Sequence, residues 1–178
     1  ELQNSGYDVV IVDNLSNSSA DVVDNIEKVS GIRPAFEKLD CLDFEGMDKL
    51  FTKYPGIKGI IHFAASKAVG ESVQKPLLYY RNNLVSLINL LELMPKHGVE
   101  GIIFSSSCTV YGQPDVLPVT EEAPIKKAES PYGNTKQINE EIIRDTVASG
   151  SPINAIMLRY FNPIGAHPTA LIGELRSE

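Results

Sequence analysis

A tyrosine and a lysine that lie four residues apart, Tyr132 and Lys136, form the pair in this sequence whose types and spacing suit proton transfer. They open a predicted helix, 131–149, so both side chains point from one face of its first turns. A phenol with an ordinary pKa near 10 is not a base at pH 7, but a neighbouring ammonium favours the phenolate. The spacing alone is weak evidence, because Tyr54 and Lys58 share it across a Pro-Gly turn.

Three serines close an apolar run shortly before this helix. Hydroxyl groups at the end of a strand can donate to a substrate oxygen or hold a catalytic phenol. Ser107, the last of the three, is the candidate for that role. A simple Ser-rich turn is the alternative explanation of the same segment.

An acid, Asp13, follows the first apolar run of the chain. In dinucleotide-binding folds, an acid at the end of the second strand hydrogen-bonds a ribose 2′-hydroxyl and favours NAD over NADP. The Gly-rich turn of that motif belongs about 20 residues upstream, whereas only 12 residues precede Asp13 here. The alternative is that Asp13 merely starts a turn.

Short apolar runs alternate with amphipathic segments along the whole chain. Strands are predicted at 8–12, 34–39, 58–64, 100–106 and 153–159, and helices at 20–30, 44–53, 76–97 and 131–149. This alternation predicts an α/β fold with a doubly wound parallel sheet, which binds ligands at the carboxyl ends of its strands. With 178 residues, the chain is expected to form one partial, Rossmann-like dinucleotide-binding domain over 1–178 that is incomplete at both ends.

Composition excludes several classes of partner. Sixteen basic against 23 acidic residues give a net charge of −7, which argues against nucleic acid. No apolar run reaches the roughly 18 residues that span a membrane, and the first residues do not resemble an export signal. Two cysteines, Cys41 and Cys108, indicate a reducing, cytoplasmic location. His62 has no partner at metal-ligand spacing, so no metal is expected.

Five longer segments resemble the extended short-chain dehydrogenase/reductase family. They are Val-Asp-Asn-Leu-Ser-Asn-Ser (12–18), His-Phe-Ala-Ala-Ser-Lys-Ala-Val-Gly-Glu-Ser-Val (62–73), Phe-Ser-Ser-Ser-Cys-Thr-Val-Tyr-Gly (104–112), Ser-Pro-Tyr-Gly-Asn-Thr-Lys (130–136) and Leu-Arg-Tyr-Phe-Asn-Pro-Ile-Gly-Ala-His-Pro (158–168). The family's first strand, its Gly-rich loop and its C-terminal portion have no counterpart here. We therefore expect the chain to be roughly the middle of a longer protein.

The resemblance implies roles for individual residues. Ser107, Tyr132 and Lys136 are similar to the family's catalytic triad, in which the positive nicotinamide ring further favours the phenolate. The implied NAD contacts are Asp13, Asn14, Asp40, Cys41, Phe63, Ala64, Ala65, Lys67, Asn82, Tyr132, Lys136 and Phe161. The implied substrate contacts are Ser107, Tyr132 and Asn162.

The implied activity is reversible oxidation at C4 of a UDP-sugar, which interconverts UDP-glucose and UDP-galactose through a 4-keto intermediate with tightly bound NAD. One alternative is another nucleotide-sugar epimerase, dehydratase or decarboxylase of the family. The dehydratases and decarboxylases resemble this chain less, because Cys108 and Thr109 stand where they need an acid. The other alternative is an inactive cofactor-binding fragment.

The two longest predicted helices, 76–97 and 131–149, are apolar beyond a single stripe. Leu84, Leu87 and Leu91 occupy more than one side of the first helix. Surplus apolar surface favours a partner, and in the resembling family these helices pair across a two-fold axis. We therefore expect a homodimer for the full-length protein.

Overall fold

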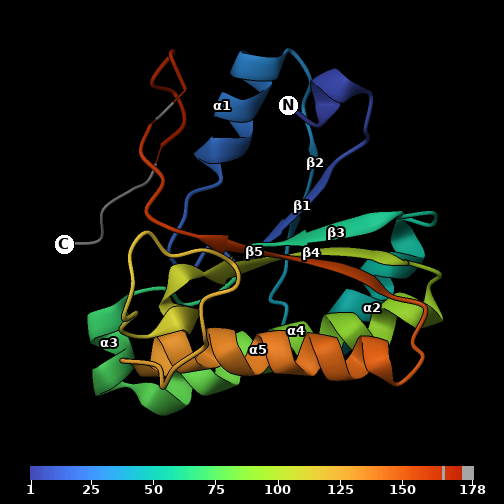
Figure 1. The fold of residues 1–178 in the computed structure, drawn as a ribbon. Helices are drawn as coiled ribbons and strands as arrows, with labels where there is room; N and C mark the ends of the chain where they lie inside the picture. The colour runs from blue at the N-terminus through green and yellow to red at the C-terminus, as the bar shows by residue number, and fades with distance from the viewer. Residues whose placement is uncertain (166, 174–178) are drawn as a thin grey trace. The chain divides into compact units, whose positions relative to one another are not determined.

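The computed structural model describes residues 1–165 and 167–173, which form two compact units. Unit 1 contains residues 1–41 and the described residues from Pro163 onward, and unit 2 contains residues 42–162. Each unit is built from parallel strands and helices (Figure 1). The predicted α/β, Rossmann-like fold class is thereby confirmed.

Unit 1 is a small strand–helix–strand arrangement. It consists of η1 (Gln3–Ser5), β1 (Val10–Asp13), α1 (Asp21–Ser30) and β2 (Ala35–Lys38). The two strands pair in parallel, with Val10 opposite Ala35 and Asp13 opposite Lys38. The residues that follow Asp13 and Lys38 therefore leave this sheet at the same edge.

Unit 2 contains a parallel sheet of three strands in the order β3-β4-β5. The strands are β3 (Gly59–His62), β4 (Gly101–Ser107) and β5 (Asn154–Tyr160). His62 lies opposite Phe104, and Ser107 lies opposite Tyr160. All three strands end at one edge, and β4 extends beyond the last residue of β3.

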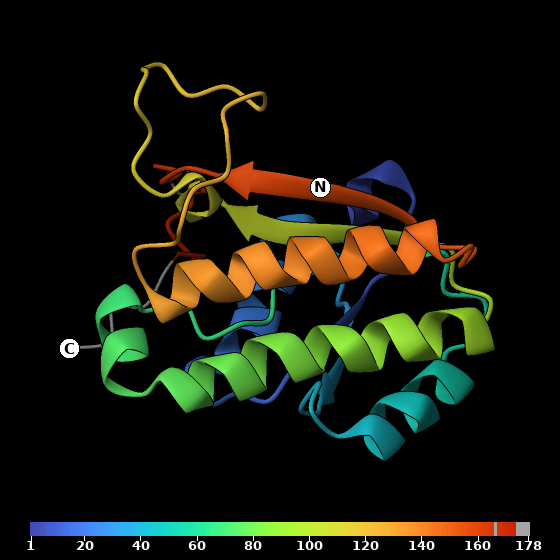
Figure 2. The ribbon, with the colours of Figure 1, turned by 60° about the horizontal axis from the view of Figure 1, so that its bottom comes forward.

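Helices of unit 2 cover one face of this sheet. They are α2 (Phe44–Lys53), α3 (Val69–Gln74), α4 (Pro76–Lys96) and α5 (Pro131–Ala148), with the short η2 (Cys108–Tyr111) after β4. The two long helices, α4 and α5, lie side by side (Figures 1 and 2). Leu87 and Leu93 of α4, Ile143 of α5, and Ile102 and Phe104 of β4 are fully buried in the core between helices and sheet.

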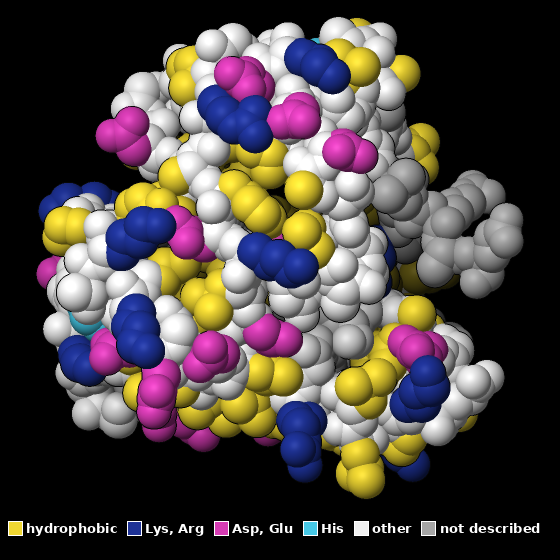
Figure 3. All heavy atoms as spheres, turned by 180° about the vertical axis from the view of Figure 1, so that it is seen from behind, with side chains coloured by type: hydrophobic (Ala, Val, Ile, Leu, Met, Phe, Trp, Pro, Cys, Tyr) yellow, Lys and Arg dark blue, Asp and Glu magenta, His cyan; other side chains and the backbone are white. Residues whose placement is uncertain are grey.

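The other face of the three-stranded sheet differs from the predicted doubly wound sheet, in which helices cover both faces. Ile61 of β3 is 40% exposed, and Ile156 and Leu158 of β5 are 56% and 39% exposed. These side chains are exposed because the two long helices of unit 2, α4 and α5, both pack on the opposite face of the sheet. On the face of the molecule drawn in Figure 3, basic and acidic side chains are interspersed with apolar ones.

Most predicted elements lie within two residues of their predicted bounds, and α2 has both of them as predicted. Sequence analysis missed η1, α3 and η2, which are only three to six residues long. It also predicted one continuous sheet, whereas the described strands form two separate sheets, β1-β2 and β3-β4-β5. No helix in the described part of the chain is long and apolar enough to span a membrane.

Candidate active site

The helix that carries Tyr132 and Lys136 has a well-defined start. The hydroxyl of Ser130 accepts a hydrogen bond from the backbone N–H of Gly133 at 3.1 Å, and Pro131 occupies the first helical position. Both features are typical of helix N-termini, because the cap satisfies an unpaired donor and proline loses none. Tyr132 therefore stands in the first turn of α5, and Lys136 follows one turn later.

Close packing brings the end of β4 against the start of α5. A Cβ added to Gly133 would lie 3.3 Å from the Cβ of Thr109 in η2 and 3.5 Å from the hydroxyl of Ser130. Glycine therefore allows η2 to approach the first turn of α5 closely. Ser107, which precedes η2 and is 8% exposed, lies close enough to the phenol of Tyr132 to lower its pKa. In Figure 2, the arrowheads of β4 and β5 point to the end of the unit at which α5 begins.

Several nearby groups affect the pKa of the Tyr132 phenol. Burial raises its pKa above the ordinary value, because a charged phenolate is disfavoured away from water. The hydroxyl of Ser107 and the positive charge of Lys67 lower the pKa of Tyr132. A base at this position thus depends on groups that stabilise the phenolate, and Ser107 and Lys67 are two of them.

Lys136 is buried, and its ammonium group points toward β4. Its Nζ donates to the carbonyl oxygen of Ser105 at 2.6 Å and lies 4.9 Å from the centre of the Phe104 ring. The distance from Nζ to the centre of the Tyr132 ring is 5.7 Å. Burial lowers the pKa of Lys136 to about 8. His62 is buried as well, and its own burial, together with the nearby charge of Lys136, lowers its pKa to about 4. This histidine is therefore neutral at pH 7.

The loop after β3 contains the next group of predicted cofactor contacts, namely Phe63, Ala64, Ala65 and Lys67. Phe63 is 63% exposed, and the alanines leave the backbone accessible at the end of the strand. The loop is held from α4, where the amide of Asn82 donates to the hydroxyl of Ser66 at 3.1 Å. Asn82, a predicted contact of NAD, therefore lies beside this loop.

Phe161 and Asn162 directly follow β5 and are exposed. Because the three strands of unit 2 are parallel, these two residues lie at the same sheet edge as Ser107 and the loop after β3. Unit 2 thus brings together its predicted site residues at the carboxyl ends of the strands.

The remaining predicted contacts gather in unit 1. The side-chain amide of Asn14 donates to Asp40 Oδ2 at 2.9 Å, which connects the ends of β1 and β2. Asp13 Oδ1 accepts from the backbone N–H of Leu15 at 2.6 Å and from the Ser18 hydroxyl at 2.8 Å. Asp13 therefore does organise a turn, which was the alternative explanation, and it does so beside the other predicted contacts.

Cys41 completes this set in unit 1. Burial raises the pKa of its thiol to about 11, and the negative charges of Asp40 and Asp13 add to that increase. The thiol is therefore protonated at pH 7 and is not a nucleophile there. Both Cys41 and Cys108 are thiols outside any disulfide.

Sequence analysis missed a buried polar cluster beneath Ser107. Its centre is the carboxylate of Glu140 on α5, which is fully buried and accepts hydrogen bonds from Ser106 and Arg159. A charged residue on the apolar side of a predicted helix, one turn after Lys136, was the available signal. Among the described residues, no group of three His, Cys, Asp or Glu side chains could hold a metal ion.

Comparison with known proteins places this arrangement in a family. The sequence profile of the NAD dependent epimerase/dehydratase family matches residues 1–176. The UDP-glucose 4-epimerase of Bacillus subtilis is 49% identical over 174 residues, covering 98% of this chain and 50% of that protein. The human UDP-glucose 4-epimerase is 46% identical over 180 residues, covering 98% of this chain and 51% of that protein.

Solved structures agree with these sequence matches. The crystal structure of UDP-glucose 4-epimerase from Bifidobacterium longum in complex with NAD+ and UDP has a TM-score of 0.94 and 47% identity, covering 97% of this chain and 51% of that chain. The structure from Stenotrophomonas maltophila with NAD and formylated UDP-arabinopyranose has a TM-score of 0.94 and 45% identity, covering 99% of this chain and 52% of that chain. The chain thus spans about half the length of the curated relatives it matches, and it belongs to the NAD dependent epimerase/dehydratase family.

Proposed function

We propose that the full-length protein interconverts UDP-glucose and UDP-galactose by oxidising and reducing C4 of the sugar. The observation that supports this most directly is the position of Tyr132 at the end of β4, where the Ser107 hydroxyl lowers the pKa of its phenol and the Nζ of Lys136 lies 5.7 Å from the centre of its ring. This is a proton-accepting site, and the matched relatives are named UDP-glucose 4-epimerases.

NAD is the cofactor that the donor and acceptor groups fit. In unit 1, Asp13, Asn14 and Asp40 offer carboxylate and amide groups suited to the hydroxyls of the adenosine ribose, and Cys41 lies beside them. In unit 2, the small residues after β3, together with Asn82, Lys136 and Phe161, would hold the nicotinamide end. When bound, NAD supplies the reversible acceptor for the hydrogen and electron pair that leave C4.

The residues of unit 2 then have distinct tasks. Tyr132, as phenolate, accepts the proton of the sugar 4-hydroxyl, and Ser107 donates a hydrogen bond to the same oxygen. Lys136 keeps a positive charge near the phenol while its Nζ remains bound to the Ser105 carbonyl. The 4-keto sugar turns over in the site, and Tyr132 returns the proton when the hydrogen returns on the other face. Asn162, at the end of β5, would contact the nucleotide-sugar.

A dehydratase or decarboxylase is the less favoured activity of this family. Those reactions need an acid in the segment after the serines, where this chain has Cys108 and Thr109. The hydroxyl of Thr109 is buried without a hydrogen-bond partner. Neither side chain is a carboxylic acid, so epimerisation fits this segment better.

A homodimer and a cytoplasmic location are further parts of the proposal. Two of the leucines from which a partner was predicted, Leu87 and Leu91, are instead buried in the core of unit 2. Other apolar side chains are exposed: on α4, Leu77, Val85 and Ile88 are 81%, 37% and 37% exposed, and on α5 Val147 is 41% exposed. Apolar side chains on two adjacent helices favour a second copy as partner. The location rests on the two cysteine thiols, which are typical of reducing compartments.

The activity is tested by incubating the purified full-length protein with UDP-galactose and following the sugar C1 and C4 signals by NMR. We expect UDP-glucose to accumulate without net consumption of NAD, because each cycle regenerates the cofactor. Formation of a 4-keto-6-deoxy sugar or a pentose instead would assign a different activity of the family. No turnover despite bound NAD would refute the proposal for this protein.

A further inference from the structure

The carboxylate of Glu140 is the most highly connected buried charge in unit 2. Its Oε1 accepts from the Ser106 hydroxyl at 2.6 Å and from Arg159 Nε at 2.9 Å. Its Oε2 accepts from Arg159 Nη2 at 2.7 Å and from Arg144 Nη2 at 2.5 Å. Glu140 has no exposed surface, so a single side chain joins α5 to both β4 and β5 in the interior.

The contacts of this carboxylate lead directly to the candidate catalytic groups. Ser106 immediately precedes Ser107 in β4, so its hydroxyl fixes the backbone from which the Ser107 side chain projects toward Tyr132. Glu140 itself lies four residues after Lys136 and eight after Tyr132, on the same side of α5. The carboxylate therefore connects the two elements that carry Ser107 and Tyr132.

A second connection runs through Arg159 to η2. While Nε and Nη2 of Arg159 pair with Glu140, its Nη1 donates to the Tyr111 hydroxyl at 3.0 Å, and its guanidinium lies 4.8 Å from the centre of the Tyr111 ring. Tyr111 is the last residue of η2, which begins immediately after Ser107. Ser107 is thus fixed from the residue before it and from the end of the turn after it.

Burial alone does not explain why a carboxylate occupies this position. Burial would raise the pKa of Glu140, but hydrogen bonds from Arg159 and Ser106 outweigh it, so the pKa is lowered and the group is charged. A buried ion pair is often no more stabilising than apolar residues of similar volume. An apolar residue forms no directional hydrogen bonds. A carboxylate accepts hydrogen bonds from donors on three elements and so holds them in a fixed geometry.

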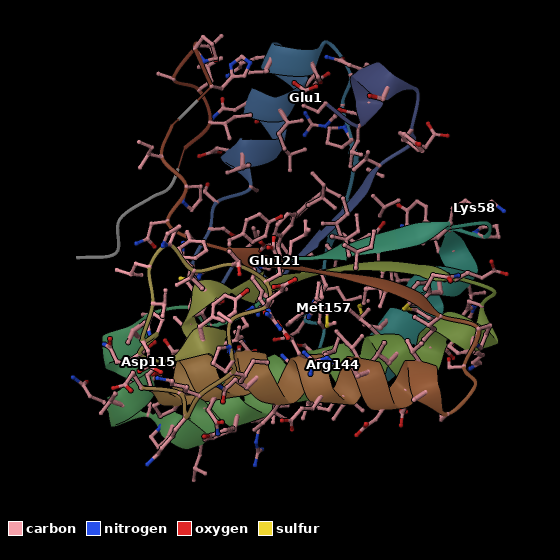
Figure 4. The ribbon with its side chains drawn as sticks, in the orientation of Figure 1. Glu1, Lys58, Asp115, Glu121, Arg144 and Met157 are labelled. Carbon is pink, nitrogen blue, oxygen red and sulfur yellow. The ribbon has the colours of Figure 1, made fainter. Side chains whose placement is uncertain are left out.

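We propose that Glu140 is a positioning residue that, through Ser106 and through Arg159, sets the Ser107 hydroxyl against the Tyr132 phenol. This inference rests on the proposed function for its effect on turnover. Its effect on the phenol does not depend on turnover, because the nearby Ser107 hydroxyl lowers the pKa of Tyr132 whether or not the sugar reacts. Figure 4, with Arg144 of α5 and Met157 of β5 labelled, shows the side chains that fill the space between this helix and the sheet.

The test uses the full-length protein and three variants. Ser106→Ala removes one donor and leaves the charged groups in place, whereas Glu140→Gln removes the charge at the centre of the cluster. Glu141→Gln is the matched control, because Glu141 is the exposed neighbour on the same helix. Circular dichroism melting identifies folded variants, and Ser106→Ala carries the test if Glu140→Gln does not fold.

The first readout is the ultraviolet titration of tyrosinate, with the contribution of Tyr132 obtained by subtracting the same titration of Tyr132→Phe. We expect Ser106→Ala and Glu140→Gln to move the Tyr132 titration to higher pH, and Glu141→Gln to leave it unchanged. The second readout is the steady-state kinetics with UDP-galactose, from which kcat and KM are obtained separately. A misplacement of about 1 Å costs on the order of a hundredfold in rate, so we expect Ser106→Ala to lower kcat about tenfold or more with KM nearly unchanged.

A double variant separates positioning from general loss of structure. If Ser106 acts through Ser107, Ser106→Ala should have little further effect on the Tyr132 titration once Ser107 has been changed to Ala. An unchanged Tyr132 titration in the folded Ser106→Ala variant overturns the proposal, as does an equal shift with and without Ser107. A protein that shows the expected shifts but does not epimerise UDP-galactose refutes the proposed function and leaves the positioning role in place.

Discussion

Asn83 of α4 pairs its side-chain amide with both backbone groups of Ser66. Its Oδ1 accepts from the Ser66 N–H at 2.8 Å, and its Nδ2 donates to the Ser66 carbonyl at 3.0 Å. The same Nδ2 lies 3.1 Å from the hydroxyl of Thr135, the residue before Lys136. One buried amide therefore holds the loop after β3 against α4 and against α5, the helix that carries Tyr132.

We predict that Asn83→Leu in the full-length protein weakens NAD binding at least about tenfold, because the loop that contains Phe63–Lys67 loses its fixed backbone. Unpaired buried polar groups cost about 1–3 kcal/mol each, so the free energy of unfolding should fall by about 3 kcal/mol. Asn89→Leu is the matched control, since Asn89 on the same helix donates to the Leu42 carbonyl. Equal weakening of NAD binding in both variants, measured by calorimetry, would contradict the prediction.

Tyr132→Phe should keep NAD binding and lose epimerisation at least about a hundredfold, which is the usual scale for removal of a positioned base. The phenyl ring keeps the packing of the first turn of α5, so the melting temperature should change little. The comparison is between kcat with UDP-galactose and the dissociation constant for NAD. Near-normal turnover would remove Tyr132 from the role of base.

The charge of Asp13 should make the full-length protein prefer NAD over NADP at least about tenfold, because the carboxylate repels a 2′-phosphate. Asp13→Asn should narrow that preference. This variant keeps an oxygen that can accept from Leu15 and Ser18, so the turn after β1 is retained. Binding titrations with both cofactors measure the ratio, and equal affinities in the unaltered protein would refute the assignment.

Acid sensitivity should depend on His62. Burial, with the charge of Lys136, lowers its pKa from 6.5 to about 4. Between these values the unfolded chain binds a proton that the folded chain does not, so stability is lost as the pH falls from 6.5 through about 4. The loss from this residue is about 3 kcal/mol.

His62→Leu should remove this contribution, so its free energy of unfolding should fall less than that of the unaltered protein as the pH is lowered. Denaturant unfolding at a series of pH values measures the difference. His167→Ala is the control, because the side chain of His167 is exposed. Parallel pH profiles for His62→Leu and the unaltered protein would contradict the assignment of the acid sensitivity to His62.

The proposed dimer predicts that a charge on α4 disrupts association. Ile88→Glu should convert the full-length protein to monomers at micromolar concentration, because an unpaired charge is costly within an apolar interface. Val116→Glu, at an exposed apolar residue in the loop before α5, should leave the mass unchanged. Light scattering measures the molecular mass of each protein. A monomeric mass for the unaltered protein would contradict the proposed dimer.

The sequence predicted those features that depend on local patterns. Apolar runs located the five strands, and the helical pattern over 131–149 located α5, because both signals repeat within a few residues. Family resemblance then indicated which residues after the strands to consider. Within each unit, most of these residues lie near the ends of the strands, and their roles stay predictions.

Contacts between residues that are far apart along the chain could not be predicted from the sequence. The role of Glu140 requires Ser106 and Arg159, which are 34 and 19 residues away along the chain. Likewise, the spacing of Tyr132 and Lys136 gave their common helix face but not the fact that the ammonium binds the Ser105 carbonyl. These are properties of packing, which a periodicity cannot specify.

The three parallel strands of unit 2 have a consequence for how the protein folds. Parallel neighbours require long crossovers, and the polar bonds between α4 and α5 join residues 52 and 56 positions apart. The entropy of closing such loops must be overcome before these contacts stabilise anything, which makes folding of this kind of topology slow. Ser107 and Tyr132 belong to different elements, so the site is complete only when β4 and α5 have docked against each other.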